Sequence, residues 1–97
     1  MPIRTFADAL TADLFRGARP AAFAADVQAR ARRKLQQLHV ATCLADLRLP
    51  GNDLKKLHGE ENRYQLRSNR KHRIRFTVEC EAPLSLRDVA AGDVHDA

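Results

Sequence analysis

The chain has few aromatic residues, few cysteines and no long apolar run. Tryptophan is absent, and with four Phe and one Tyr the core is expected to consist mainly of Leu, Val, Ile and Ala. Cys43 and Cys80 belong to no Cys/His cluster, which predicts buried thiols in a reducing compartment. No stretch approaches the about 20 apolar residues that span a bilayer, and the N-terminus lacks the apolar region of a signal peptide. We therefore expect a cytoplasmic protein with no membrane segment.

Metal-binding and nucleotide-hydrolysing motifs are also missing. No His, Cys, Asp or Glu set has metal-ligand spacing, and no glycine-rich loop suits a phosphate cradle. We therefore expect no metal and no other cofactor. The 97 residues allow one small domain, 1–97, and an apolar share of 44% argues against disorder.

The N-terminal half predicts two helices. The first covers about residues 7–16, after a short strand at Ile3–Phe6, with Thr5 as cap and Gly17 as stop. The second runs from about Ala24 to Leu38, because its apolar residues recur at spacings of three and four. A connector at Thr42–Leu49 then directs three leucines, Leu44, Leu47 and Leu49, toward the edge of the core.

The period changes after the turn signal Pro50-Gly51-Asn52-Asp53. Apolar and polar residues alternate over 63–67 and again over 72–79, with a polar reversal at 68–71 between them. That two-residue period is typical of half-buried antiparallel strands. A last strand over 84–89 follows Pro83. We predict an α+β domain in which two N-terminal helices cover one face of a small antiparallel sheet.

Positive charge is concentrated in the middle of the chain. The formal net charge is +5, and residues 55–75 hold eight Lys or Arg against two acids, Glu60 and Glu61. The strand period places four arginines on the sheet face that the helices leave open: Arg63, Arg67, Arg73 and Arg75. An open cationic face indicates a polyanionic partner, most simply a nucleic acid.

Several ordered motifs resemble those of one known family. These are IRTFAD…LF, ARRKLQQLHVA, LADLRLPGNDLKKLHG and YQLRSNRKHRIRF, spread over about Ile3–Phe76. In this order they resemble HigB-type toxins of bacterial toxin–antitoxin systems, within the RelE/ParE superfamily. The resemblance implies a RelE-like fold, a metal-independent ribosome-dependent cleavage of mRNA, and a hetero-oligomer with a helix-turn-helix (HigA-like) antitoxin.

The resemblance also implies site residues. Arg73 matches the arginine that supports the scissile phosphate, and Arg67 matches one on the preceding strand. His58 lies where many relatives have lysine. Lys55 lies three residues earlier, where some relatives have histidine, so this chain carries the His/Lys pair in the reverse order. Asp93-Val94-His95 is the counterpart of a terminal Asp-Tyr-His.

Cleavage through a 2′-hydroxyl needs a base, an acid and cations that stabilise the phosphorane. We expect His58 and His95 to carry protons, because imidazole titrates near neutral pH, and Asp93 to orient His95 or contact the RNA. We expect Arg67 and Arg73 to stabilise the phosphate, because a guanidinium can bind two phosphate oxygens. The residues expected to bind RNA are Lys55, Lys56, Arg63, Arg67 and Arg75. Lys55 and Lys56 point to opposite faces in a strand, so we expect only one of them, Lys55, to reach the site.

Other interpretations stay open. Because Val94 replaces the family tyrosine, the protein could be a weakened or inactive toxin that only binds its antitoxin or RNA. It could also be a gyrase-targeting member of the superfamily. We expect His39 and His72 to be structural. The Arg30-Arg32-Arg33-Lys34 cluster is expected to be a solvated helix face, with ribosomal RNA or an acidic antitoxin segment as alternatives.

Overall fold

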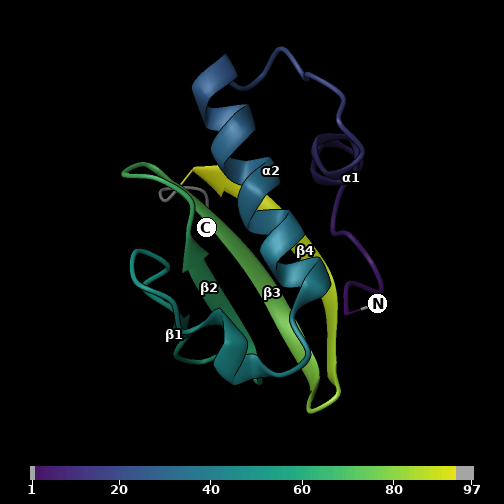
Figure 1. The fold of residues 1–97 in the computed structure, drawn as a ribbon, viewed down its shortest axis with the longest axis vertical. Coiled ribbons are helices and arrows are strands. Elements are labelled where there is room, and N and C mark those ends of the chain that lie inside the picture. The colour runs from purple at the N-terminus through teal and green to yellow at the C-terminus, as the bar shows by residue number, and fades with distance from the viewer. Residues whose placement is uncertain (1, 94–97) are drawn as a thin grey trace.

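A computed structural model describes residues 2–93 of the chain, which form two α-helices, a short 3₁₀ helix and four strands. Helix α1 spans Ala9–Phe15, α2 spans Ala25–Val40, and the 3₁₀ helix η1 spans Leu44–Leu47. The strands are β1 (Lys55–Lys56), β2 (Arg63–Arg67), β3 (His72–Glu81) and β4 (Leu84–Asp93). They pair antiparallel in the order β1-β2-β3-β4, and α2 lies across one face of the sheet (Figure 1). The predicted α+β class is confirmed.

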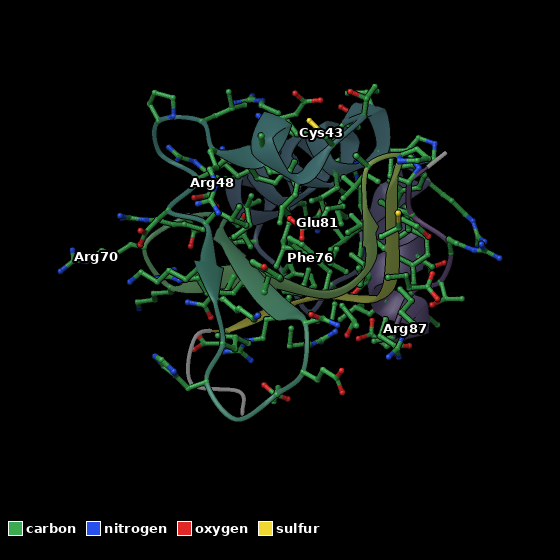
Figure 2. All side chains as sticks on the ribbon, turned by 90° about the horizontal axis from the view of Figure 1, so that it is seen from below. Cys43, Arg48, Arg70, Phe76, Glu81 and Arg87 are labelled. Atoms are coloured by element: carbon green, nitrogen blue, oxygen red, sulfur yellow. The ribbon has the colours of Figure 1, made fainter. Side chains whose placement is uncertain are left out.

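The predicted alternation is confirmed along β2 and the first half of β3, whereas Phe76, Thr77 and Val78 are all buried, with Arg63 bonded to Thr77 on the open face. Leu66, Ile74 and Phe76 are fully buried against the leucines of the two helices. Figure 2 shows Phe76 in the interior, with Arg70 and Arg87 pointing outward on opposite sides of the molecule. Burying a side chain of this size stabilises the fold by about 1.5–3 kcal/mol. Since strand residues alternate between faces, the same packing directs the intervening polar residues away from the helices.

Helix α2 forms as its spacing predicts and extends two residues beyond Leu38. Ala31, Leu35 and Leu38 are buried on one side, while Arg30 and Arg33 are exposed on the other. Its N-cap residue, Ala24, makes no side-chain capping bond. The helix therefore owes its stability mainly to its buried stripe and to the helix propensity of its Ala, Gln, Arg and Leu residues.

Helix α1 begins later than predicted, because its cap is Asp8 and not Thr5. The Asp8 Oδ1 atom accepts a hydrogen bond from the Thr11 backbone N–H at 2.7 Å. Thr5 instead accepts from the backbone N–H of Asp88 at 2.9 Å. Gly17 follows the helix with φ of 95°, the left-handed conformation that glycine adopts without steric cost, so the predicted stop is confirmed.

The first residues lie along β4 without forming the predicted strand at Ile3–Phe6. Two isolated parallel bridges join Ile3 to Leu86 and Phe6 to Val89. Backbone hydrogen bonds from Arg4 to Leu86 and from Leu86 to Pro2 support them. This segment covers the outer edge of β4, which would otherwise expose its unpaired N–H and C=O groups.

The connector after α2 confirms two of its three predicted core leucines. Leu44 and Leu47 are buried on η1, whereas Leu49 is 46% exposed, because the chain has already turned outward toward Pro50-Gly51-Asn52-Asp53. The Asn52 backbone N–H donates to the Leu49 carbonyl at 3.0 Å and closes this predicted turn.

The prediction of two buried thiols is wrong. Cys43 is half-buried, and Cys80 is exposed because it lies near the end of β3, beyond the part of the strand that the helices cover.

Candidate functional site

The sheet register brings the predicted arginines to one face. Arg67 pairs with Arg73 and Gln65 with Arg75 across β2 and β3, and Arg63 pairs with Thr77. Directly paired residues share a face of the sheet, and this face is opposite the one that Leu66 and Ile74 bury. Lys55 of β1 pairs with Gln65 and therefore belongs to the same face, as predicted.

A groove of about 690 Å³ lies on this open face, and we call it the sheet-face groove. His58 comes from the loop between β1 and β2, Arg63 from β2, and Arg73 and Arg75 from β3. The remaining wall is formed by the end of β4 and by acidic and apolar residues: Asp8, Leu57, Glu60, Ala90, Ala91 and Gly92. On β4, Ala90 pairs with Arg75 and Gly92 pairs with Arg73, so the strand beside the two arginines carries little or no side chain on this face.

The loop that carries His58 is shaped by backbone geometry. Gly59 and Asn62 have positive φ values of 79° and 55°. The Leu57 N–H donates to the Arg63 carbonyl at 2.7 Å and closes the loop at its base. His58 is exposed at the edge of the groove, so its imidazole is accessible to a substrate that lies over Arg73 and Arg75.

Arg73 is held by the turn that joins β2 to β3. Its Nη1 atom donates to the Asn69 carbonyl at 2.7 Å and to the His72 carbonyl at 3.0 Å. The Asn69 side chain in turn accepts from the backbone N–H groups of Lys71 and His72 at 2.9 and 2.8 Å. These bonds restrict the guanidinium of Arg73 before any ligand arrives, which reduces the entropy lost on binding.

Arg63 is anchored more deeply. Its Nη1 atom donates to Thr77 Oγ1 at 3.2 Å and to the Asp88 carbonyl at 2.9 Å, which ties β2 to the far strand β4. Burial lowers the pKa of the Arg63 guanidinium, and the nearby carboxylates of Glu60 and Asp88 partly oppose that effect. Arg63 therefore lines the groove and also braces the sheet beneath it.

Asp93 is the last residue of β4. It pairs with His72, next to the pairing of Gly92 with Arg73, so Asp93 lies one residue pair away from Arg73 in the sheet. Val94 and His95, the rest of the predicted terminal motif, lie outside the described residues. The role of His95 stays a prediction from the sequence.

Three predicted RNA-binding residues do not line this groove. Lys55 is on the correct face but forms an ion pair with Asp53 at 3.4 Å. Lys56 pairs with Tyr64 and so belongs to the opposite face. Arg67 ends β2 and lines a different groove, beside the turn at 68–71. Strand alternation gives the face of a residue but not its position along that face, which explains the difference for Lys55 and Arg67.

Asp8 and Glu60 were missed at the sequence level. Glu60 is two residues from His58 and could have been found from that spacing. Asp8 reaches the groove only because α1 packs beside β4, a long-range arrangement that no local pattern indicates.

His39 and His72 have structural contacts. The His39 ring meets the edge of Phe15 with 4.9 Å between centroids, and its Nδ1 is buried without a hydrogen-bond partner. The His72 ring lies against Phe23 at 5.8 Å, and its Nδ1 is 3.0 Å from Asn69 Oδ1.

Within residues 2–93, no group of three or more His, Cys, Asp or Glu side chains is arranged to hold a metal ion. None of the helices in that range is both long and apolar enough to cross a bilayer. In comparisons with known proteins, no protein-family model and no curated protein matches the chain.

Proposed function

We propose that the protein is a HigB-type toxin that cleaves mRNA on the ribosome without a metal. The observation that carries this proposal is that His58 shares one open groove with Arg73 and Arg75. His58 would supply one of the two proton-transfer groups that 2′-hydroxyl chemistry on a phosphodiester requires, and the two guanidinium groups would supply the cations. The sequence motifs quoted above support the same activity, and with it a helix-turn-helix antitoxin, a hetero-oligomer and a cytoplasmic location.

The proposed reaction includes two proton transfers, one to a base of the protein and one from an acid of the protein. The 2′-hydroxyl oxygen attacks the adjacent phosphorus while a base takes its proton, and the bond from phosphorus to the 5′-oxygen breaks. The leaving 5′-oxygen receives a proton from an acid, so the products are a 2′,3′-cyclic phosphate and a 5′-hydroxyl. His58 fills one of these two roles, and His95 is proposed for the other, with Asp93 orienting it.

Arg73 and Arg75 stabilise the charge on the phosphorane. A guanidinium presents paired N–H donors to two phosphate oxygens. In Arg73 the Nη1 atom is already bonded to the turn carbonyls, so the orientation of its guanidinium is set by the protein. Groups that are oriented before the reaction stabilise a transition state without reorganisation.

The test is cleavage of mRNA on programmed ribosomes by the purified full-length protein, with 5′ ends mapped by primer extension. Wild type should cut the message, and His58→Ala and Arg73→Ala should not. Arg87→Ala is the matched control, because Arg87 is an exposed arginine of β4 outside the groove, paired with Asp88 at 2.7 Å.

Intact mRNA with the wild-type protein would overturn the nuclease proposal. Expression in a bacterial host then separates the alternatives. Growth arrest with DNA damage would indicate a gyrase poison. Unimpaired growth would indicate a binding-only homologue, inactive because Val94 replaces the family tyrosine.

A further inference from the structure

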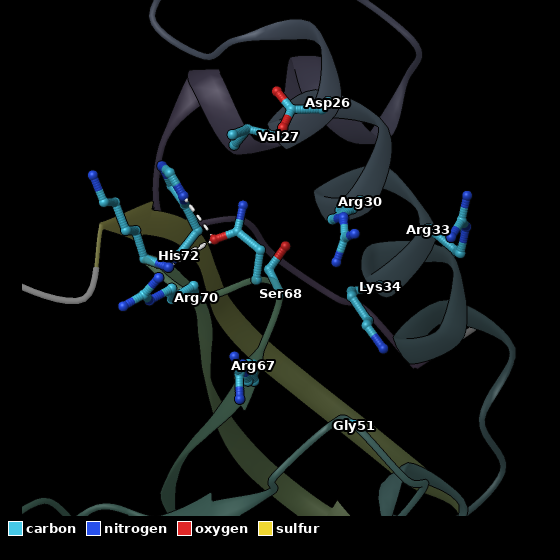
Figure 3. Close-up of a pocket in the computed structure, with 12 residues that line it drawn as sticks. Asp26, Val27, Arg30, Arg33, Lys34, Gly51, Arg67, Ser68, Arg70 and His72 are labelled. Atoms are coloured by element: carbon cyan, nitrogen blue, oxygen red, sulfur yellow. Dashed lines mark hydrogen bonds between the residues drawn. The ribbon is translucent and has the colours of Figure 1, made fainter.

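A second groove lies between α2 and the turn that joins β2 to β3 (Figure 3). This helix–turn groove has a volume of about 680 Å³ and shares no lining residue with the sheet-face groove. Its only carboxylate among the described residues is Asp26. Six cationic side chains line it: Arg30, Arg33 and Lys34 from α2, and Arg67, Arg70 and Lys71 from the other side.

The positive charge of these six side chains is not offset by neighbouring carboxylates among the described residues. Within residues 2–93, none of the six forms an ion pair with a carboxylate. Their neighbour Arg32 is different: it donates to the Leu14 carbonyl at 2.9 Å and to the Ala18 carbonyl at 2.7 Å, which ties α2 to α1. The basic cluster of α2 thus divides into one structural arginine and three side chains that face the groove.

The crowding of positive charge affects Lys34. Partial burial lowers the pKa of its ammonium group, and the nearby Arg33 and Arg30 lower it further. Its Nζ donates to Asn52 Oδ1, a neutral acceptor that does not offset the charge. Like charges held together raise the free energy of the empty groove, and a bound anion would reverse that effect.

Ser68 provides a second and independent sign of a ligand. Only 5% of the residue is exposed, and its Oγ has no hydrogen-bond partner. Figure 3 shows the hydroxyl on the side of Ser68 that faces α2, among the cations. A buried hydroxyl without a partner costs free energy, and a hydroxyl donor beside guanidinium groups suits the oxygens of a phosphate.

The lining favours RNA over a protein segment. Protein–protein interfaces depend on apolar and aromatic anchors at their centre, and the exposed large hydrophobic residues of the described chain, Val40 and Leu49, lie outside this groove. Nucleic-acid interfaces are more polar and more positive. Three cations come from α2 and three from the β2–β3 side, so the positive charge extends across the whole groove.

We propose that the helix–turn groove binds the phosphodiester backbone of RNA, with Ser68 donating to a phosphate oxygen. This contact is separate from the proposed cleavage site and does not depend on it.

The experiment measures binding of a fluorescein-labelled, fully 2′-O-methylated RNA oligonucleotide to the full-length protein by anisotropy. This RNA lacks the 2′-hydroxyl and cannot be cleaved by the proposed chemistry, so failure of the nuclease proposal does not affect the result. Arg30→Gln/Arg33→Gln should weaken binding about tenfold or more and reduce the slope of log K against log salt by about 1.4. Arg16→Gln/Arg19→Gln removes the same charge from exposed residues outside both grooves and should change affinity less than about twofold.

Ser68→Ala tests the hydroxyl and should weaken binding about fivefold, the loss expected for one hydrogen bond. Circular dichroism confirms that each variant is folded. Equal losses in the two double variants would overturn the proposal, because they would show only a response to net charge. Unchanged RNA affinity in Arg30→Gln/Arg33→Gln, with loss of binding to a Glu-rich peptide, would also overturn it in favour of an acidic protein partner. Unchanged affinity in Ser68→Ala would overturn the contact proposed for that residue.

Discussion

The two grooves are both cationic, but their arginines are held in different ways. In the sheet-face groove, Arg63 and Arg73 donate to backbone carbonyls and are oriented by the fold. In the helix–turn groove, the side chains of Arg30 and Arg33 make no hydrogen bond or ion pair with the described residues. Oriented donors suit chemistry at one phosphate, whereas unrestrained cations suit electrostatic attraction to many. The sheet-face groove therefore presents oriented arginines, and the helix–turn groove presents positive charge without a fixed orientation.

The largest effect is expected from a substitution that destabilises the whole fold and so disrupts both grooves. Ile74 is fully buried under α2, between the β3 arginines. Ile74→Asp buries an unpaired charge and should destabilise the fold by on the order of 4 kcal/mol or more. Urea denaturation monitored by circular dichroism measures the change, and Ile74→Val, at about 1 kcal/mol, is the matched control. A fully stable Ile74→Asp protein would contradict the packing described for β3.

A selective loss is expected at Arg73. Arg73→Ala should reduce cleavage on the ribosome by about 100-fold or more and lower the urea midpoint by less than Arg63→Ala does, because the bonds it loses join Arg73 to its own turn and do not cross the sheet. Arg73→Lys retains the charge but not the fork, so it should recover little activity. If Arg73→Lys were as active as wild type, charge alone would suffice, and the distinction between the two grooves would fail.

Replacing Arg63 should lower the stability of the fold, because Arg63 joins two strands of the sheet. Arg63→Ala removes the bonds to Thr77 and Asp88 and should lower the free energy of unfolding by about 1–2 kcal/mol. Arg67→Ala, on the same strand but exposed, should change it by less than about 0.5 kcal/mol. Equal stabilities of the two variants in urea would show that the anchoring of Arg63 is unimportant.

The smallest effect should lie far from both grooves, at Asp46. Hydrogen bonds from the Thr42 backbone and hydroxyl, and from Cys43, lower the pKa of this carboxylate below its ordinary 3.8. Because the folded-state pKa is the lower one, the stabilisation is present above pH 3.8 and is lost as pH falls through the folded-state value.

Asp46→Asn should therefore lower the melting temperature slightly at pH 7, and the difference from wild type should shrink in acid. Thr42→Val removes one donor to Asp46 and should reproduce part of this pH dependence without affecting either groove. A difference between Asp46→Asn and wild type that stays constant from pH 7 to pH 3 would contradict the assignment.

Local patterns predicted much of the fold. The alternation over 63–67 matches β2, and the stripe on α2 matches its buried face, because both depend on nearest neighbours in the chain. The cap of α1 was misplaced because Thr5 and Asp8 both suit an N-cap, and only the docking of Thr5 against Asp88 decides between them.

The sites were less accessible to prediction. The shared face of the arginines followed from strand period, but their division between two grooves depends on where α1 and α2 pack. Asp8 entered one groove and Ser68 the other through contacts that no spacing encodes. The helical spacing of Arg30, Arg33 and Lys34 indicated a common face without showing that it looks toward the turn at 68–71.

The docking of the first residues on β4 has a consequence for synthesis. Thr5 bonds to Asp88, 83 residues later, and Ile3 and Phe6 bridge to Leu86 and Val89. A nascent chain cannot form these contacts until β4 has left the ribosomal exit tunnel. The end of β4 also forms one wall of the sheet-face groove, so that groove is completed only after β4 has left the exit tunnel. If the protein cuts mRNA on ribosomes, as we propose, a nascent chain whose β4 is still inside the tunnel lacks one wall of the cleavage groove, which protects the ribosome that makes it.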